Sequence, residues 1–178
     1  MIYEIISSGF GGQGALTIGK FLAQAGMKEG KNVSWLPSYG PEMRGGTANV
    51  SAVISDQPVA SPIVSFPNVL VALNQPSLDK FAANVVKGGY IIANETLCPK
   101  VPHFEGVKTV AAPLTDIANE IGSDKVVNMI AIGIVIGLTN MIKYDTIAAD
   151  LTSFLEKKNP ELLKMNLIAI KKGMELAK

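Results

Sequence analysis

Gly9-Phe10-Gly11-Gly12-Gln13-Gly14 stands between the apolar run Ile2-Tyr3-Glu4-Ile5-Ile6 and a segment with helical periodicity. A strand that runs through glycines into a helix is how α/β proteins hold a phosphate. The glycines let backbone N–H groups approach an anion closely, and the positive end of the helix dipole points at the same place. The spacing also satisfies the dinucleotide fingerprint G-x-G-x-x-G. This stretch predicts an α/β fold with an anion-binding loop.

Apolar segments typical of strands alternate with helical patterns through the first two thirds of the sequence, and helices dominate the rest. Strands are predicted at residues 2–8, 32–36, 47–55, 68–73, 90–93 and 108–112, with Pro37 ending the second one. Helices are predicted at residues 13–29, 77–86, 116–120, 125–138, 145–157 and 160–177. This order predicts an α/β protein, a Rossmann-like three-layer α/β/α sandwich with a helical C-terminal third. Because no linker or repeat divides the chain, residues 1–178 are predicted to form a single domain.

Composition excludes several classes of function. The chain has 178 residues, with 16 Lys and Arg against 15 Asp and Glu, so no basic field indicates a nucleic-acid partner. It has one cysteine, Cys98, and one histidine, His103. A single cysteine cannot form an internal disulfide, a four-cysteine cluster site or a zinc ribbon. His103 lies in a Pro-rich stretch, where we expect it to be solvated rather than catalytic. We therefore predict no metal site and no catalytic residue.

The sequence also bears on location and surface. Met1-Ile2-Tyr3-Glu4 has no basic n-region or cleavage site, and the longest apolar stretch, residues 129–138, is far short of the roughly 20 residues that span a bilayer. We expect a cytoplasmic protein without a membrane partner. Charged residues make up 17% of the chain, against about 25% in typical domains. Either a tight, glycine-rich domain or a surface covered by other subunits explains this, and we favour the second.

The glycine motif could indicate a dinucleotide site or a P-loop, but each of these needs a further residue that this sequence lacks. An NAD site needs an acidic residue about 20 residues past the loop, at the end of the second strand. Residues 35–38 read Trp-Leu-Pro-Ser, so NAD and FAD are both disfavoured. Residues 14–21 come close to the phosphate-binding pattern G-x-x-x-x-G-K-[ST], but Phe21 occupies the Ser/Thr position, so no hydroxyl is offered to Mg²⁺. Gly19 and Lys20 also fall inside a predicted helix, and this interpretation is rejected.

A second unusual segment, Ser38-Tyr39-Gly40-Pro41-Glu42-Met43-Arg44-Gly45-Gly46-Thr47, consists largely of turn residues. Arg44 can make a two-pronged contact with a phosphate or carboxylate, or it can form a solvated pair with Glu42. Loops after neighbouring strands meet at the carboxyl edge of an α/β sheet, where ligands bind. We therefore expect the two loops to face the same crevice.

Gly133 and Gly137 lie one turn apart in the predicted helix 125–138. They make a flat strip that another helix can approach closely. That helix belongs either to this chain or to another subunit, and the sequence leaves both alternatives open.

Together, the two loops resemble those of the gamma subunit of the 2-oxoacid:ferredoxin oxidoreductases, with the form of residues 39–46 most similar to the 2-oxoglutarate branch. Other segments of this chain also resemble the family, namely Ser61-Pro62, residues 69–73 followed by Asn74-Gln75-Pro76, and residues 128–138. The resemblance implies a subunit of an enzyme that oxidatively decarboxylates a 2-oxoacid with coenzyme A and passes electrons to ferredoxin. Thiamine diphosphate, Mg²⁺ and iron–sulfur clusters then belong to the partner subunits: alpha, the thiamine-binding beta and the ferredoxin-like delta. This chain is expected to bind none of these cofactors alone and to be inactive alone.

The resemblance also implies that the two loops lie on the coenzyme A side of the enzyme or contact a neighbouring subunit. The predicted site comprises Gly9, Gly11, Gly12, Gln13, Gly14, Tyr39, Glu42, Arg44, Gly45, Gly46 and Thr47. Two further interpretations stay open: an independent nucleotide-binding module, and a structural scaffold whose loops only pack against a partner.

Overall fold

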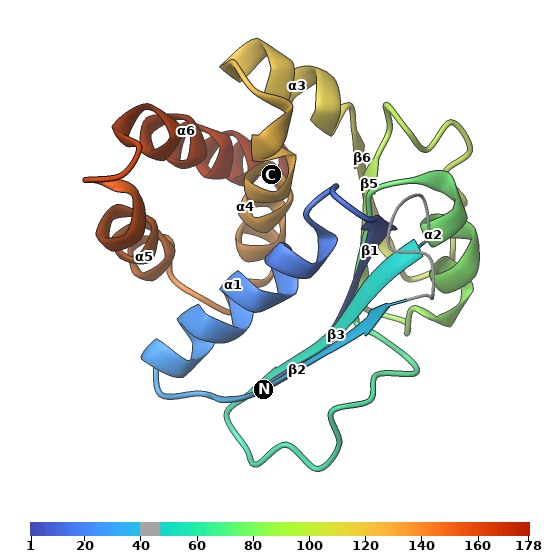
Figure 1. Cartoon of the computed structure of the whole chain (residues 1–178). Coiled ribbons are helices and arrows are strands. Elements are labelled where there is room, and N and C mark those ends of the chain that lie inside the picture. The colour runs from blue at the N-terminus through green and yellow to red at the C-terminus, as the bar shows by residue number, and fades with distance from the viewer. Residues whose placement is uncertain (40–46) are drawn as a thin grey trace.

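The computed structural model describes residues 1–39 and 47–178, which form a six-stranded sheet with helices on both faces (Figure 1). The strand order is β2-β3-β1-β4-β5-β6. Strands β1, β4, β5 and β6 are parallel, whereas β3 is antiparallel to both of its neighbours, β1 and β2. The strands are β1 Ile2–Phe10, β2 Asn32–Tyr39, β3 Thr47–Ser55, β4 Val69–Ala72, β5 Tyr90–Asn94 and β6 Lys108–Ala112.

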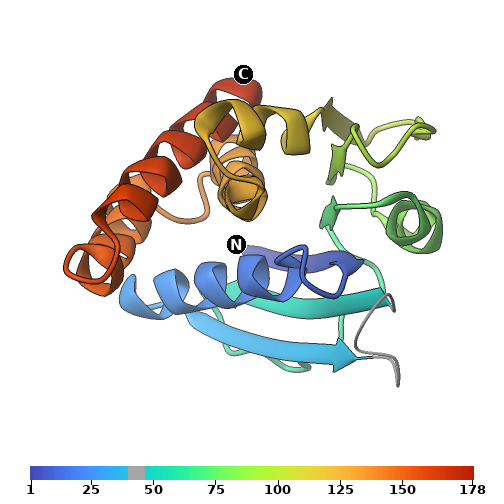
Figure 2. The ribbon, with the colours of Figure 1, turned by 45° about the horizontal axis from the view of Figure 1, so that its top comes forward.

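Most of the helices pack on one face of the sheet (Figures 1 and 2). This face carries α1 Ala15–Lys28, α3 Leu114–Ile121, α4 Val127–Thr139, α5 Tyr144–Leu155 and α6 Pro160–Leu176, with a 3₁₀ turn, η2 Asp124–Val126, leading into α4. The other face carries α2 Gln75–Phe81 and a second 3₁₀ turn, η1 Ala82–Asn84. The predicted α/β/α fold with a helical C-terminal third is confirmed, although the antiparallel β3 makes the sheet mixed and the Rossmann likeness approximate. No helix in the described ranges is long and apolar enough to cross a membrane.

Most predicted boundaries agree with the structure to within two residues, but those of β2 and α2 differ in ways that have a physical reason. Strand β2 continues through Pro37 to Tyr39 instead of ending at the proline. Proline is tolerated there because β2 is an edge strand, whose outer backbone groups need no partner strand. Helix α2 begins at Gln75 because the side chain of Asn74 caps it by accepting a hydrogen bond from the Ser77 N–H. The same helix ends at Phe81, well before the predicted end at residue 86.

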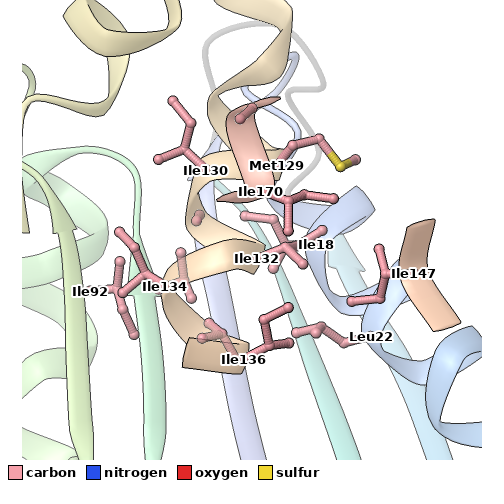
Figure 3. Packing of buried hydrophobic residues seen from close by; sticks show 14 of the residues in the cluster. Ile18, Leu22, Ile92, Met129, Ile130, Ile132, Ile134, Ile136, Ile147 and Ile170 are labelled. Atoms are coloured by element: carbon pink, nitrogen blue, oxygen red, sulfur yellow. The ribbon is translucent and has the colours of Figure 1, made fainter. Parts of the chain in front are cut away.

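The centre of the larger core is α4, which is apolar around its whole circumference because the sheet and α6 enclose it. Figure 3 shows Ile132 and Ile136 beside Ile18 and Leu22 of α1. On its other side, Gly133 packs so closely on α6 that an added Cβ would overlap the Ile170 carbonyl. The glycine strip therefore makes a contact within this chain.

Candidate functional site

The carboxyl ends of β1, β2 and β4 lie at one edge of the sheet. Phe10 at the end of β1 pairs with Thr47, and Tyr39 at the end of β2 pairs with Ala48. The ends of β1 and β2, which carry the two predicted loops, therefore lie at the same edge of the sheet and are separated by one strand, β3. Strand β1 leads to α1 on one face and β4 leads to α2 on the other (Figure 1). This divergence is a topological switch point, the place where open α/β sheets bind ligands.

Only the two ends of the second predicted loop belong to the described residues. Tyr39 and Thr47 are the strand residues that bracket it. The predicted site residues Glu42, Arg44, Gly45 and Gly46 lie outside the described residues.

Glycine is required at several positions of the first loop. Gly12 and Gly14 have φ angles of 94° and 82°, the left-handed region in which a side chain is strained. Gly9 has an ordinary φ, but an added Cβ would lie 2.7 Å from Gln13 Oε1. Gly11 is exposed next to them. The loop geometry thus depends on glycine for backbone conformation at two positions and for space at a third.

The loop leads directly into α1. Gly14 is the N-cap residue and supplies no side-chain cap, so the first-turn N–H groups of α1 receive no side-chain acceptor from it. The loop itself is closed by two hydrogen bonds. The Gln13 N–H donates to the Phe10 carbonyl (3.1 Å), and the Phe10 N–H donates to Gln13 Oε1 (2.7 Å).

A pocket of about 420 Å³ lies beside this loop. Its polar lining includes Gln13, Thr17, Asn94, Thr115, Lys125 and Asn128. Gly14, Thr115 and Asn128 mark the N-terminal ends of α1, α3 and α4, which all border the pocket. Helix N-termini favour negative charge, and Lys125 adds a cation, although Asp124 on the same rim offsets it. The pocket suits a ligand with an anionic group and further polar atoms.

The pocket wall is rigid on the β5 side. Asn94 is buried at the end of β5, donates from Nδ2 to Thr115 Oγ1 (2.9 Å) and accepts from the Thr115 N–H (3.3 Å). On the α4 side, an added Cβ at Gly14 would lie 3.1 Å from Asn128 Nδ2. Asn128 Oδ1 is buried and has no hydrogen-bond partner among the described residues.

Six polar residues that line this pocket were not predicted from the sequence: Thr17, Asn94, Thr115, Asp124, Lys125 and Asn128. Asn94 had a usable signal, since it is a polar residue where a predicted parallel strand ends. Lys125 and Asn128 had none, because only the packing of α4 against the loop brings them to this edge.

The chain's single histidine and single cysteine both lie outside this pocket. His103 is exposed in the connection between β5 and β6. Cys98 is fully buried on the α2 side of the sheet, and burial raises the pKa of its thiol to about 11. The thiol is therefore protonated at neutral pH and unreactive. Among the described residues, no group of three or more His, Cys, Asp or Glu is placed to hold a metal ion.

Comparison with known families identifies the fold unit. A model of the pyruvate ferredoxin/flavodoxin oxidoreductase family matches residues 4–176. The chain belongs to this family. The glycine loop and the residues that line the pocket all lie within the matched range.

Relatives of this family member occur as short and as long chains. Ketoisovalerate oxidoreductase subunit VorA of Methanothermobacter thermautotrophicus is 41% identical over 175 residues, which are 96% of this chain but 35% of VorA. The 2-oxoglutarate synthase subunit KorC of Methanocaldococcus jannaschii is 36% identical over 179 residues, covering 98% of this chain and 94% of KorC. This chain thus spans about a third of VorA and nearly all of KorC.

Solved structures agree with these relatives. The keto/oxoacid ferredoxin oxidoreductase gamma subunit of Geobacter sulfurreducens superposes with a TM-score of 0.83 at 30% identity, covering 98% of both chains. A 2-oxoglutarate:ferredoxin oxidoreductase from Magnetococcus marinus, with 2-oxoglutarate, coenzyme A and succinyl-CoA bound, matches with a TM-score of 0.89 at 28% identity. That match covers 99% of this chain and 31% of the other. The resemblance to gamma subunits seen in the sequence is confirmed.

Proposed function

We propose that this chain is the gamma subunit of a multi-subunit 2-oxoacid:ferredoxin oxidoreductase. The observation that carries the proposal is the size pattern of its relatives. The same unit makes up nearly all of KorC, which is named a subunit of 2-oxoglutarate synthase, and only a third of VorA, where further chain accompanies it. The reaction of the complex is the coenzyme A-dependent oxidative decarboxylation of a 2-oxoacid, with two electrons passed to ferredoxin. Thiamine diphosphate, Mg²⁺ and the iron–sulfur clusters belong to the alpha, beta and delta partners.

We favour 2-oxoglutarate as the substrate. Two observations support it: the Tyr-Gly-Pro-Glu-Met-Arg-Gly-Gly form of residues 39–46, and the match to KorC over almost its whole length. Ketoisovalerate is the second candidate, supported by the higher identity to VorA.

The proposed role of this chain is to form one wall of the coenzyme A crevice. Coenzyme A carries phosphate groups, which suit the uncapped N-terminus of α1 and the cation Lys125. Its amide and adenine groups suit the polar side chains of Gln13, Thr17 and Asn128 that line the pocket. Arg44 is proposed to complete this wall from the second loop. A structural scaffold role would use the same loops for subunit contacts alone.

The test requires the assembled enzyme, prepared by co-purifying or co-expressing the partner subunits. A panel of 2-oxoacids with coenzyme A and ferredoxin names the substrate, and the proposal expects 2-oxoglutarate to give the highest kcat/KM. Arg44→Ala and Lys125→Gln are each expected to raise the KM for coenzyme A about tenfold through a lost charge-assisted contact, with Lys164→Gln on the exposed side of α6 as the control. Unchanged KM values and unchanged assembly for both variants would overturn the coenzyme A assignment.

A further inference from the structure

A side-chain bridge crosses the switch point between β1 and β4. At such a point the two loops diverge to opposite faces and leave a crevice between them. Here Gln13 of the β1–α1 loop and Asn74 of the β4–α2 turn meet across it, with Asn74 Nδ2 donating to Gln13 Oε1 at 3.0 Å. The two residues are 61 positions apart in the sequence.

Both amides are fixed in orientation by their other partners. Gln13 Oε1 also accepts the Phe10 N–H at 2.7 Å, so both of its neighbours are donors and only the oxygen can satisfy them. Asn74 Oδ1 accepts the Ser77 N–H at 2.9 Å, which leaves Nδ2 to face Gln13. Rotating either amide would exchange a donor for an acceptor and lose two hydrogen bonds. Gly9 provides the space, since a Cβ there would overlap Gln13 Oε1.

The bridge is anchored in the buried part of the sheet. Asn74 is 1% exposed, and Ser8 and Ser77 beneath it are fully buried. The hydroxyls of Ser8 and Ser77 lie 2.9 Å apart and hydrogen-bond to each other. The chain of contacts therefore runs from the interior of β1 through the start of α2 to the glycine loop. Hydrogen bonds anchored in a buried network of this kind favour a single geometry.

We propose that Gln13 and Asn74 form a positioning pair that closes the crevice between β1 and β4 and holds the glycine loop in its ligand-binding shape. With that side bridged, the loop borders the pocket that the N-terminal ends of α3 and α4 also line. Asn74 acts through Gln13, whereas Gln13 both holds the loop and lines the pocket. The coenzyme A consequence rests on the function proposed above, but the loop-holding role does not.

Asn74→Ser separates the bridge from the helix cap. Serine is a good N-cap residue, so α2 keeps its cap, but its side chain is too short to reach Gln13. Asn159→Ser is the matched control, because Asn159 caps α6 through the Leu162 N–H and has no hydrogen bond to the described residues of either loop. Hydrogen exchange of the full chain, read on a peptide that contains the Phe10 N–H, is expected to be about threefold to tenfold faster in Asn74→Ser and unchanged in Asn159→Ser.

Kinetics of the assembled enzyme supply the second measurement. Asn74→Ser is expected to raise the KM for coenzyme A about threefold to tenfold with little change in kcat, a split that a general loss of stability would not produce. Gln13→Met should have an effect that does not add to that of Asn74→Ser in the double variant, because both remove the same bond. Unchanged exchange in Asn74→Ser would overturn the positioning role. Faster exchange with an unchanged KM would support the positioning role and refute the coenzyme A assignment of the loop.

Discussion

At the scale of single residues, the site depends on the absence of a side chain at three glycines. Gly12 and Gly14 adopt left-handed backbone angles, and Gly9 leaves room for the oxygen of Gln13. These are separate physical requirements, one conformational and one steric. Only the general need for glycine was readable from the G-x-G-x-x-G spacing.

Gly14→Ala and Gly30→Ala separate the conformational requirement from the steric one. Both glycines have a positive φ, 82° and 75°, but only an added Cβ at Gly14 meets a neighbour, the Asn128 side chain at 3.1 Å. Gly30→Ala is expected to reduce the free energy of unfolding by about 1 kcal/mol, and Gly14→Ala by about 2–3 kcal/mol. Urea denaturation of both variants measures the difference. Equal losses would show that the contact with α4 contributes nothing.

At the scale of elements, the position of α4 determines both the core and the pocket. Its glycine face lies against the backbone of α6, its other faces pack on α1 and β5, and its N-terminus borders the glycine loop. The sequence indicated a buried helix with a flat strip. It left the strip's partner undecided between this chain and another subunit, because a close helix contact looks the same in either case.

Gly133→Ala and Gly137→Ala test this contact. The new Cβ of Gly133→Ala would overlap the Ile170 carbonyl, and backbone cannot move aside as a side chain can. That of Gly137→Ala would lie 2.7 Å from the Cβ of Ala177, close to the end of α6. We expect Gly133→Ala to cost more than about 3 kcal/mol of unfolding free energy, or to prevent folding, and Gly137→Ala to cost clearly less. Thermal denaturation checks the order, and a reversed order would contradict it.

Cys98 provides a test of the packing on the opposite face of the sheet, which carries α2. Burial raises the pKa of its thiol to about 11 from the ordinary 9.0, so the native protein keeps the thiol neutral. A group whose folded pKa is raised contributes stability below its unfolded pKa and loses it as the pH rises. Stability should therefore fall between about pH 9 and pH 11, and Cys98→Ser should remove that part of the pH dependence. At pH 8 a thiol reagent should modify Cys98 only at the rate of unfolding, and fast modification of native protein would refute the burial.

At the scale of the whole molecule, we propose that the chain is one unit of a larger assembly. Relatives carry it alone or within chains about three times as long. Coverage of its surface by other subunits, inferred from the low charge content, stays a prediction. An independent nucleotide-binding module would behave differently, because its ligand would bind the isolated chain.

A thermal-shift series on the isolated chain distinguishes these cases. Because the second strand ends without an acidic residue and Phe21 stands in place of the Mg²⁺-binding hydroxyl, we expect NAD, FAD and ATP each to shift the melting temperature by less than about 1 °C. Stabilisation by several degrees at submillimolar ligand would favour the nucleotide-binding module and contradict the gamma-subunit proposal.

The sequence by itself determined the elements whose signals are local. The strand–glycine–helix start, the buried helix 125–138 and the lack of an acid after the second strand all follow from short-range pattern, propensity and composition, and the structure places their elements accordingly. Its boundaries failed where tertiary position overrides local preference: Pro37 continues β2 because that strand lies at the sheet edge, and Asn74 starts α2 early by capping it.

Only the tertiary structure decided what meets at the site. The antiparallel insertion of β3, the approach of Lys125 and Asn128 to the glycine loop and the bridge from Gln13 to Asn74 all join residues far apart in the chain. No local pattern encodes such contacts, because they depend on which elements share a sheet edge and how closely two helices pack. The glycine loop follows from local sequence, whereas the pocket beside it forms only because distant elements pack against that loop.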